Sequence, residues 1–326
     1  MAGVLAGITC EQVGERNERR TLKQIGTSVD IGGRTLNLHC SGEGGPVGVF
    51  ESAGAGPGLS WQPVQYEAAK FTRSCWYDRA GEGWSDPGPF PRTGEAIARD
   101  LHQLLQRAGM PAPYVLVGAS FGGLNVRIYG RLYPAECAGF VLVDSGHEDE
   151  PLRAPKFYLA RTVPRYLWRP LDYVFTAAAQ IGLVRLTQSP RPRRTAAAAT
   201  EREQLIERLQ QQPKSVVSSA LTGIVMAETL AEARAVTSLG DRPLIVLAAG
   251  KAPSFGDPAM DREAADYQKV WVGEMQPRLA KLSTRGRLVV LPDSDHSSIP
   301  TEVIIGAIRE VLRDSNEPEQ HVPVRR

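Results

Sequence analysis

One serine lies between two glycines where a predicted strand meets a predicted helix. The stretch Tyr114–Gly130 reads YVLVGASFGGLNVRIYG, with Ser120 near its centre. Tyr114–Val117 is a β-branched and aliphatic run typical of a buried strand, and the stretch Leu124–Arg131 is compatible with a helix. In a G-x-S-x-G turn, the glycines let the helix pack against the strand, and the strained serine projects its hydroxyl from the sheet. Ser120 is therefore a candidate nucleophile.

A serine hydroxyl needs a base to accept its proton, and histidine is the usual base because its pKa lies near neutrality. The chain has five histidines. His39 lies in an early predicted strand, and His102 lies on the outer face of a predicted helix, where we expect it to face solvent. His147 begins a segment of different composition, and His321 lies in the C-terminal tail. His296 alone occupies a loop directly after a late apolar strand, so it is the candidate base.

Apolar strands alternate with helices on both sides of Ser120. Strands are predicted over 47–51, 73–77, 114–117, 139–143, 244–249 and 287–291, helices over 93–108 and 300–312, and a hairpin around Gly32-Gly33. Such alternation implies a mostly parallel sheet with right-handed crossovers. Ligands of these sheets bind at the carboxyl ends of the strands, where Ser120 and Asp144 both lie.

The composition is that of one large α/β domain with an inserted cap, or of two small domains. The chain has 326 residues, of which 42% are hydrophobic and 23% charged, and its formal net charge is +2. No extended basic face with interleaved aromatics is evident, which argues against nucleic acid as a partner and favours a small neutral molecule. The four cysteines show no C-x-x-C spacing, so we predict neither a metal site nor a cofactor.

Four stretches resemble the α/β-hydrolase family. They are GASFGG at 118–123, YDRAGEGWSDPGP at 77–89, RLYPAECAGFVLVD at 131–144 and DSDHSSIP at 293–300. The resemblance runs from about Val29 to Leu312. It implies an α/β-hydrolase fold, with a mostly parallel eight-stranded sheet flanked by helices and an inserted helical cap. Ala119 is a departure, because many members carry histidine before the nucleophile.

The resemblance also assigns the groups around the nucleophile. In the family, one amide that binds the developing oxyanion follows a His-Gly pair, where this chain has Ser52-Ala53, so that Gly54 becomes the donor. The second donor is the amide of Phe121, directly after Ser120. The Asp78-Arg79 pair matches a motif that is mostly structural in the family, and we assign it no chemistry.

The acid that orients the histidine has two candidates. Family members usually place it just beyond the strand that ends here at Ala249, but this chain has Pro253 at that point, and Asp257 is the first carboxylate available. Asp144 occupies a position after the preceding strand that haloalkane dehalogenases of the same fold use instead. We favour Asp144 and keep Asp257 as the alternative acid.

The chain divides into four kinds of segment. Residues 1–27 form an N-terminal lead-in, residues 28–146 and 241–313 the hydrolase core, residues 147–240 a helical cap, and residues 314–326 a polar tail. The cap carries the aromatics Phe157, Tyr158, Tyr166, Trp168, Tyr173 and Phe175 and the arginines Arg161, Arg165, Arg169, Arg185, Arg191, Arg193 and Arg194. We favour cap helices that line an apolar pocket, with Leu167, Leu171, Val174 and Phe175 at helical spacing, over contact with a membrane surface.

The resemblance makes the second and fourth strands neighbours, with Cys40 at the end of one and Cys75 within the other. If the protein matures in an oxidising compartment, we predict a Cys40–Cys75 disulfide; two free thiols in a reducing cytoplasm are the alternative. The apolar start Met1–Thr9 is too short for a membrane helix and could be the remnant of a trimmed leader or anchor. The compartment and the oligomeric state stay open.

The predicted function is hydrolysis of carboxylic esters through an acyl-enzyme, with Ser120 as nucleophile and His296 as base and then acid. The substrates are predicted to be small to medium apolar esters held under the cap. Amidase, lactonase, thioesterase and acyltransferase activities on the same residues are alternatives. A ligand-binding homologue without catalysis is a further alternative, although it would not need to keep the serine and the histidine.

Overall fold

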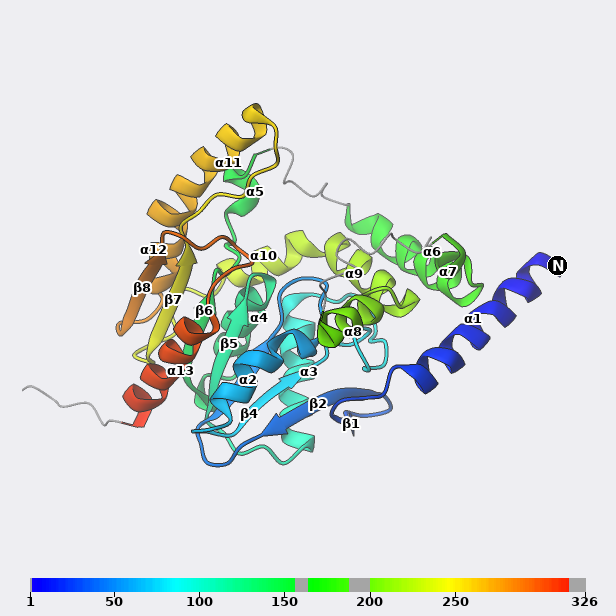
Figure 1. Ribbon diagram of the computed structural model, residues 1–326, viewed down its shortest axis with the longest axis horizontal. Helices are drawn as coiled ribbons and strands as arrows, with labels where there is room; N and C mark the ends of the chain where they lie inside the picture. The colour runs from blue at the N-terminus through cyan, green and yellow to red at the C-terminus, as the bar shows by residue number, and fades with distance from the viewer. Residues whose placement is uncertain (1, 156–163, 188–199, 317–326) are drawn as a thin grey trace, which may run out of the picture.

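A single sheet of eight strands organises the molecule, as the computed structural model shows for residues 2–155, 164–187 and 200–316 (Figure 1). The strand order is β1-β2-β4-β3-β5-β6-β7-β8. The strands are β1 (Thr27–Asp30), β2 (Thr35–Ser41), β3 (Val47–Glu51), β4 (Ser74–Tyr77), β5 (Tyr114–Ala119), β6 (Cys137–Val143), β7 (Leu244–Ala249) and β8 (Gly286–Leu291). β2 pairs antiparallel with both β1 and β4, and every other pairing is parallel. The predicted mostly parallel eight-stranded sheet is therefore confirmed.

The helices of the described residues lie on both faces of this sheet and in the segments beside it. They are α1 (Ala2–Thr21), η1 (Gly58–Trp61), α2 (Gln62–Ala68), α3 (Gly94–Arg107), α4 (Phe121–Leu132), η2 (Pro134–Glu136), α5 (Glu150–Arg153), η4 (Arg165–Leu167), α6 (Trp168–Gln180), α7 (Leu183–Thr187), α8 (Glu201–Gln210), α9 (Pro213–Ile224), α10 (Met226–Arg234), α11 (Pro258–Val270), η5 (Trp271–Met275), α12 (Gln276–Ala280) and α13 (Thr301–Asn316). α3 and α4 pack on one face, and α2 and α13 on the other. Alternate residues of β5 therefore enter two different apolar cores, which explains its continuous apolar run.

The predicted helix over 93–108 is present as α3. Thr93 caps it by accepting a hydrogen bond from the amide of Ala96, and the apolar stripe from Ile97 to Leu105 is buried. The expectation that His102 faces solvent is wrong. Its Nδ1 lies 3.1 Å from Glu136 Oε2, and its ring stacks on Tyr133 with centroids 4.0 Å apart. Glu136 and Tyr133, which follow α4 in the chain, therefore cover the face of α3 that carries His102.

Both ends of the core depart slightly from the predicted segments. The lead-in contains a long helix, α1, which extends away from the sheet beside α6 and α7 (Figure 1). Arg185 of α7 binds it through ion pairs with Glu11 and Glu18. The polar tail was predicted to begin at Asp314, but α13 continues to Asn316 because its helical hydrogen bonding persists beyond the apolar stripe. The rest of the predicted tail lies outside the described residues.

The segment 147–240 contains helices α5 to α10 in its described parts. α10 packs on α3 and α4, and α6 packs on α9 through Leu171 and Phe175. Tyr166 and Tyr173 are 77% and 67% exposed, and Val174 is exposed as well, so the expectation that these side chains line an apolar pocket is wrong. The predicted cap residues Phe157, Tyr158, Arg161, Arg191, Arg193 and Arg194 lie outside the described residues.

Two further features of the described chain bear on the earlier expectations. No single helix is long and apolar enough to cross a membrane; α9 and α10 meet those criteria only as a pair, and they are bent by 56° at their junction. Cys40 and Cys75 lie directly opposite each other on β2 and β4 and are joined by a disulfide, with Cα atoms 4.1 Å apart. Cys10 and Cys137 are free thiols.

Candidate active site

The turn between β5 and α4 presents Ser120 at the carboxyl end of a central strand. Ser120 has a φ of 50°, and its amide donates to the carbonyl of Val143 on β6 at 3.0 Å. A Cβ on Gly118 would lie 2.5 Å from the carbonyl oxygen of Gly122, and a Cβ on Gly123 would lie 2.0 Å from Ser145 Oγ. The sharp turn therefore requires glycine on both sides of the serine.

Ser120, His296 and Asp144 form one hydrogen-bonded chain. His296 Nε2 lies 3.0 Å from Ser120 Oγ, and His296 Nδ1 lies 2.6 Å from Asp144 Oδ2. The histidine follows β8 and the aspartate follows β6, so two strand ends bring both side chains to the serine. The side chain of His296 is 53% exposed, whereas that of Asp144 is 5% exposed. The imidazole is therefore open to substrate and water, while its carboxylate partner is shielded.

Electrostatics favour the protonated form of His296. The hydrogen bond that His296 donates to Asp144 raises the pKa of His296 above its ordinary value, against the opposing effect of burial, and the charges of Glu150 and Asp295 act in the same direction as that of Asp144. Burial in turn raises the pKa of the Glu150 carboxyl. An imidazole with a raised pKa is a stronger base towards a neighbouring hydroxyl.

Both oxygens of Asp144 have donors. Besides the bond to His296, its Oδ1 accepts from the amide of Ala249 at 2.9 Å and from the indole nitrogen of Trp271 at 2.8 Å. The alternative acid lies elsewhere: Asp257 caps α11, and its Oδ1 accepts from the amides of Ala259 and Met260. The structure therefore places Asp144, and not Asp257, beside the histidine.

Arg79 holds the loop that follows β3. Its guanidinium donates to the carbonyls of Ser52 and Ala53, each at 2.7 Å, and to the carbonyl of Gly54. The same guanidinium pairs with Glu51 at 2.8 Å, and both side chains are buried. The peptide planes of the loop are thus fixed by one side chain, and the structural interpretation of the Asp78-Arg79 pair is confirmed for the arginine.

The two predicted oxyanion donors lie on this loop and on α4. Phe121 is the first residue of α4, where backbone amides have no partner within the helix and the helix dipole favours negative charge. Gly54 precedes η1, and its carbonyl is engaged by Arg79. That the amides of Gly54 and Phe121 bind an oxyanion stays a prediction.

A hollow of about 330 Å³ lies beside the same loop. It is lined by Ala55, Gly56 and Pro57 of the loop, by Glu82, and by residues of α8 and α9 that include Ser215. Burial raises the pKa of Glu82 to about 7, although the pairing with Arg79 opposes this shift. α8 contacts the loop directly, because the side chain of Gln210 donates to the carbonyl of Ala55 at 2.7 Å.

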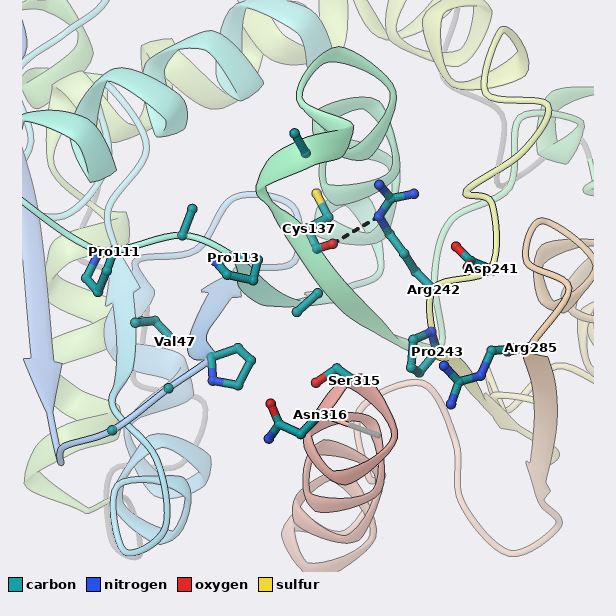
Figure 2. Close-up of a pocket in the computed structure, with 16 residues that line it drawn as sticks. Val47, Pro111, Pro113, Cys137, Asp241, Arg242, Pro243, Arg285, Ser315 and Asn316 are labelled. Carbon is teal, nitrogen blue, oxygen red and sulfur yellow. Dashed lines mark hydrogen bonds between the residues drawn. The ribbon is translucent and has the colours of Figure 1, made fainter. Parts of the chain in front are cut away.

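A larger groove, of about 710 Å³, lies at the opposite ends of the parallel strands (Figure 2). It is bordered by Val47 and Pro113 at the starts of β3 and β5, and by Arg242, whose side chain donates to the carbonyl of Cys137 at 2.9 Å. Ser120 and His296 do not line this groove. Because ligands of such sheets bind at the carboxyl ends of the strands, we assign it no part in the site. Across the described residues, no three His, Cys, Asp or Glu side chains are grouped so as to hold a metal ion.

Two signals of the site were missed from the sequence. Trp271 lies 127 residues from Asp144 in the chain, yet the two side chains are hydrogen bonded. Glu51 ends β3, and the side chains of Tyr77, Arg79 and Asn125 all donate hydrogen bonds to it. An acidic residue in an otherwise apolar strand was the one available sign.

A family model described as the alpha/beta hydrolase fold matches residues 49–303 of the chain. The chain therefore belongs to the α/β-hydrolase fold family, as the motifs around Ser120 suggested.

Single proteins that resemble this chain do so at low sequence identity or over part of their length. A probable transporter, efuK, from Hormonema carpetanum is 33% identical over 149 residues, which are 42% of this chain and 21% of that protein, so the match spans about a fifth of the relative. A thermophilic esterase from Thermogutta terrifontis has a TM-score of 0.58 at 22% identity, covering 90% of this chain and 100% of that one. The enol-lactonase from Burkholderia xenovorans LB400 has a TM-score of 0.56 at 18% identity, covering 88% and 100%. Both comparisons show a similarity of fold.

Proposed function

We propose that the protein is a serine hydrolase that cleaves carboxylic esters through an acyl-enzyme. The observation that carries the proposal is the hydrogen-bonded chain from Ser120 through His296 to Asp144. A hydroxyl, an imidazole and a shielded carboxylate in this order are the parts that acyl transfer requires.

The first half of the reaction forms the acyl-enzyme. Ser120 Oγ attacks the ester carbonyl carbon while His296 Nε2 takes the hydroxyl proton, and Asp144 stabilises the resulting imidazolium. The carbonyl oxygen becomes an oxyanion that accepts hydrogen bonds from the amides of Gly54 and Phe121. The tetrahedral intermediate collapses when the bond to the leaving alcohol breaks and His296 donates its proton to that oxygen.

The second half releases the acid. A water molecule enters beside the exposed face of His296, which takes one of its protons as the water oxygen attacks the acyl carbon. Collapse of this second intermediate breaks the bond to Ser120 Oγ and returns the proton to the serine. The enzyme is then restored, and no redox step or external cofactor is needed to balance the reaction.

The substrate is proposed to be a small or medium ester. The hollow of about 330 Å³ beside the loop 55–57 is lined by the residues that directly follow the proposed oxyanion donor Gly54, although Ser120 and His296 do not line it. The segment 147–240, whose helices α8 and α9 border this hollow, is proposed as a cap over the site.

Lactone hydrolysis is the second candidate. A lactone is a cyclic ester, so the same atoms perform the same attack, and the leaving oxygen stays attached to the acyl group. The esterase and the enol-lactonase that share the fold support both candidates equally. A ligand receptor without catalysis is disfavoured, because it would not require His296 to contact Ser120.

The test is a panel of p-nitrophenyl esters of increasing acyl length, with aliphatic lactones assayed in parallel by acid release. We expect turnover of short and medium esters, and loss of at least about 10³-fold in kcat for Ser120→Ala. Ser60→Ala is the matched control, since this serine is exposed in η1 near the loop. Turnover that survives in Ser120→Ala would refute the proposed nucleophile, and turnover of lactones alone would select the second candidate.

A further inference from the structure

The helix that follows β7 is interrupted by a π-helical turn. α11 passes into η5 at Trp271–Met275, and α12 continues from Gln276. The amide of Gln276 donates to the carbonyl of Trp271, five residues earlier, instead of four. Such a turn inserts one extra residue into a helix and is frequent at functional sites.

The inserted residue changes which side chains share a face. In a regular α-helix, residues five apart point roughly 140° away from each other, because each residue turns the chain by about 100°. In the wider turn, Trp271 and Gln276 reach two consecutive residues at the end of β6. Trp271 Nε1 donates to Asp144 Oδ1 at 2.8 Å, and Gln276 Nε2 donates to the carbonyl of Ser145 at 2.9 Å.

A third side chain of the same helix extends this contact to β7. Gln268 Nε2 donates to the carbonyl of Ala249 at 2.7 Å, and the amide of Ala249 donates to Asp144 Oδ1. Trp271 is 6% exposed and Gln276 is fully buried, so water has little access to the bonds that these two side chains make, whereas Gln268 is partly exposed. Side chains of η5 and α12 therefore hydrogen bond to the turn that carries Asp144, and His296 hydrogen bonds to the other oxygen of Asp144.

We propose that Trp271 is a positioning residue of the hydrolase, which acts through Asp144 to set the orientation and the basicity of His296. The inference rests on the proposed function, because it assigns Asp144 as the partner of the catalytic base. Gln276 and the π-helical turn serve to place the indole, and Trp271 itself touches neither Ser120 nor His296 in any hydrogen bond recorded for the described residues.

The physical reason lies in how a buried carboxylate is stabilised. Asp144 has a φ of 41°, a strained conformation that persists only when its surroundings hold it. The indole N–H of Trp271 takes up part of the negative charge of the carboxylate, so less of that charge is available to the hydrogen bond from His296. Without the indole N–H, Asp144 would attract the proton of His296 more strongly, and the pKa of His296 would rise.

Other charged groups near His296 also act on its pKa. Glu150 after β6 and Asp295 on its own loop both favour the imidazolium, and neither contacts Trp271 in a recorded hydrogen bond. Tyr267 packs near the indole with ring centroids 5.9 Å apart. Among the described residues, hydrogen bonds connect Trp271 to His296 through Asp144.

The experiment measures the pKa of His296 by NMR titration of its imidazole protons, assigned with His296→Ala, in the wild type and in Trp271→Phe. The same two proteins are assayed for kcat and KM on the best ester over a range of pH. Trp84→Phe is the matched control, because its indole also donates one hydrogen bond, to the carbonyl of Leu22 at 3.1 Å, but away from the site. Thermal unfolding of all three proteins reports the effect on stability.

We expect Trp271→Phe to raise the pKa of His296, to move the acidic limb of the pH profile upward with it, and to lower kcat about 10-fold with KM nearly unchanged. Trp84→Phe should leave the pKa and kcat unaltered. An unchanged His296 pKa in folded Trp271→Phe would overturn the inference and reduce Trp271 to packing. If that variant does not fold, replacement of Trp271 by benzothienylalanine removes the N–H and keeps the shape, and the same outcomes apply. Because the titration needs no turnover, an inactive wild type would count against the proposed function and leave this measurement intact.

Discussion

His296 and Asp144 are separated by 152 residues in the chain, yet His296 Nδ1 and Asp144 Oδ2 lie 2.6 Å apart. The aspartate follows β6 and the histidine follows β8, with β7 between them in the sheet. Ala249, at the end of β7, also donates its amide to the aspartate. Three consecutive strand ends thus build the environment of one carboxylate.

Replacing that carboxylate should impair turnover far more than replacing the alternative acid. Asp144→Asn is expected to lower kcat by about 10⁴-fold, because the neutral amide cannot stabilise the imidazolium and favours the wrong tautomer. Asp257→Asn is the matched control and should change kcat less than about 2-fold, since asparagine also caps a helix well. Steady-state kinetics on one ester check both variants, and the opposite pattern would transfer the role to Asp257.

The pH dependence follows from the raised pKa of His296. The neutral imidazole is the active base, so kcat/KM should fall as the pH drops through a midpoint above the ordinary histidine value of 6.5. The free energy of unfolding changes with pH in the opposite direction to activity. Because the pKa of His296 is raised in the folded state, this residue stabilises the fold below pH 6.5, and the stabilisation is lost as the pH rises through the folded-state pKa.

The measurement is kcat/KM from about pH 5 to 9, with Asp144→Asn as the comparison. Removal of the carboxylate should move the pKa of His296 downward, because its hydrogen bond is the largest cause of the rise. A wild-type midpoint below 6.5 would contradict the assigned pair.

Much of the fold was predictable from residue patterns within short stretches of the sequence. The glycines around Ser120 and the stripe of α3 obey rules that act within a few residues, and the structure confirms both. The hairpin at Gly32-Gly33 is also present, with the amide of Ile31 donating to Arg34 across the turn at 2.9 Å. Periodicity and turn residues determine such features without reference to distant parts of the chain.

The choice between Asp144 and Asp257 depended on how distant loops meet, which no local pattern encodes. Trp271 escaped notice for the same reason, because a π-helical turn has no sequence signature and its partner lies across the sheet. His102 was misplaced because helical spacing alone does not reveal Glu136 and Tyr133 above it. Long-range contacts therefore account for most of what the sequence did not predict.

The disulfide between Cys40 and Cys75 should be detectable as a linked pair of peptides in a non-reduced digest. Native protein should alkylate at exposed Cys10, buried Cys137 should react only after unfolding, and the linked pair only after reduction. The double variant Cys40→Ser/Cys75→Ser is expected to lose about 3 to 4 kcal/mol of unfolding free energy, measured with urea. Free alkylation of both cysteines in protein from its native host would contradict the bridge.

The most direct test of the central claim is labelling with a fluorophosphonate, which reacts only with an activated serine, followed by mass spectrometry of the digested protein. At a pH above the His296 midpoint, we predict one adduct, on the peptide that contains Ser120. Ser120→Ala should abolish it, His296→Ala should slow it by about 10³-fold or more, and Ser60→Ala should leave it unchanged. A folded wild-type protein that stays unlabelled, or a Ser120→Ala variant that labels as fast as the wild type, would contradict the account.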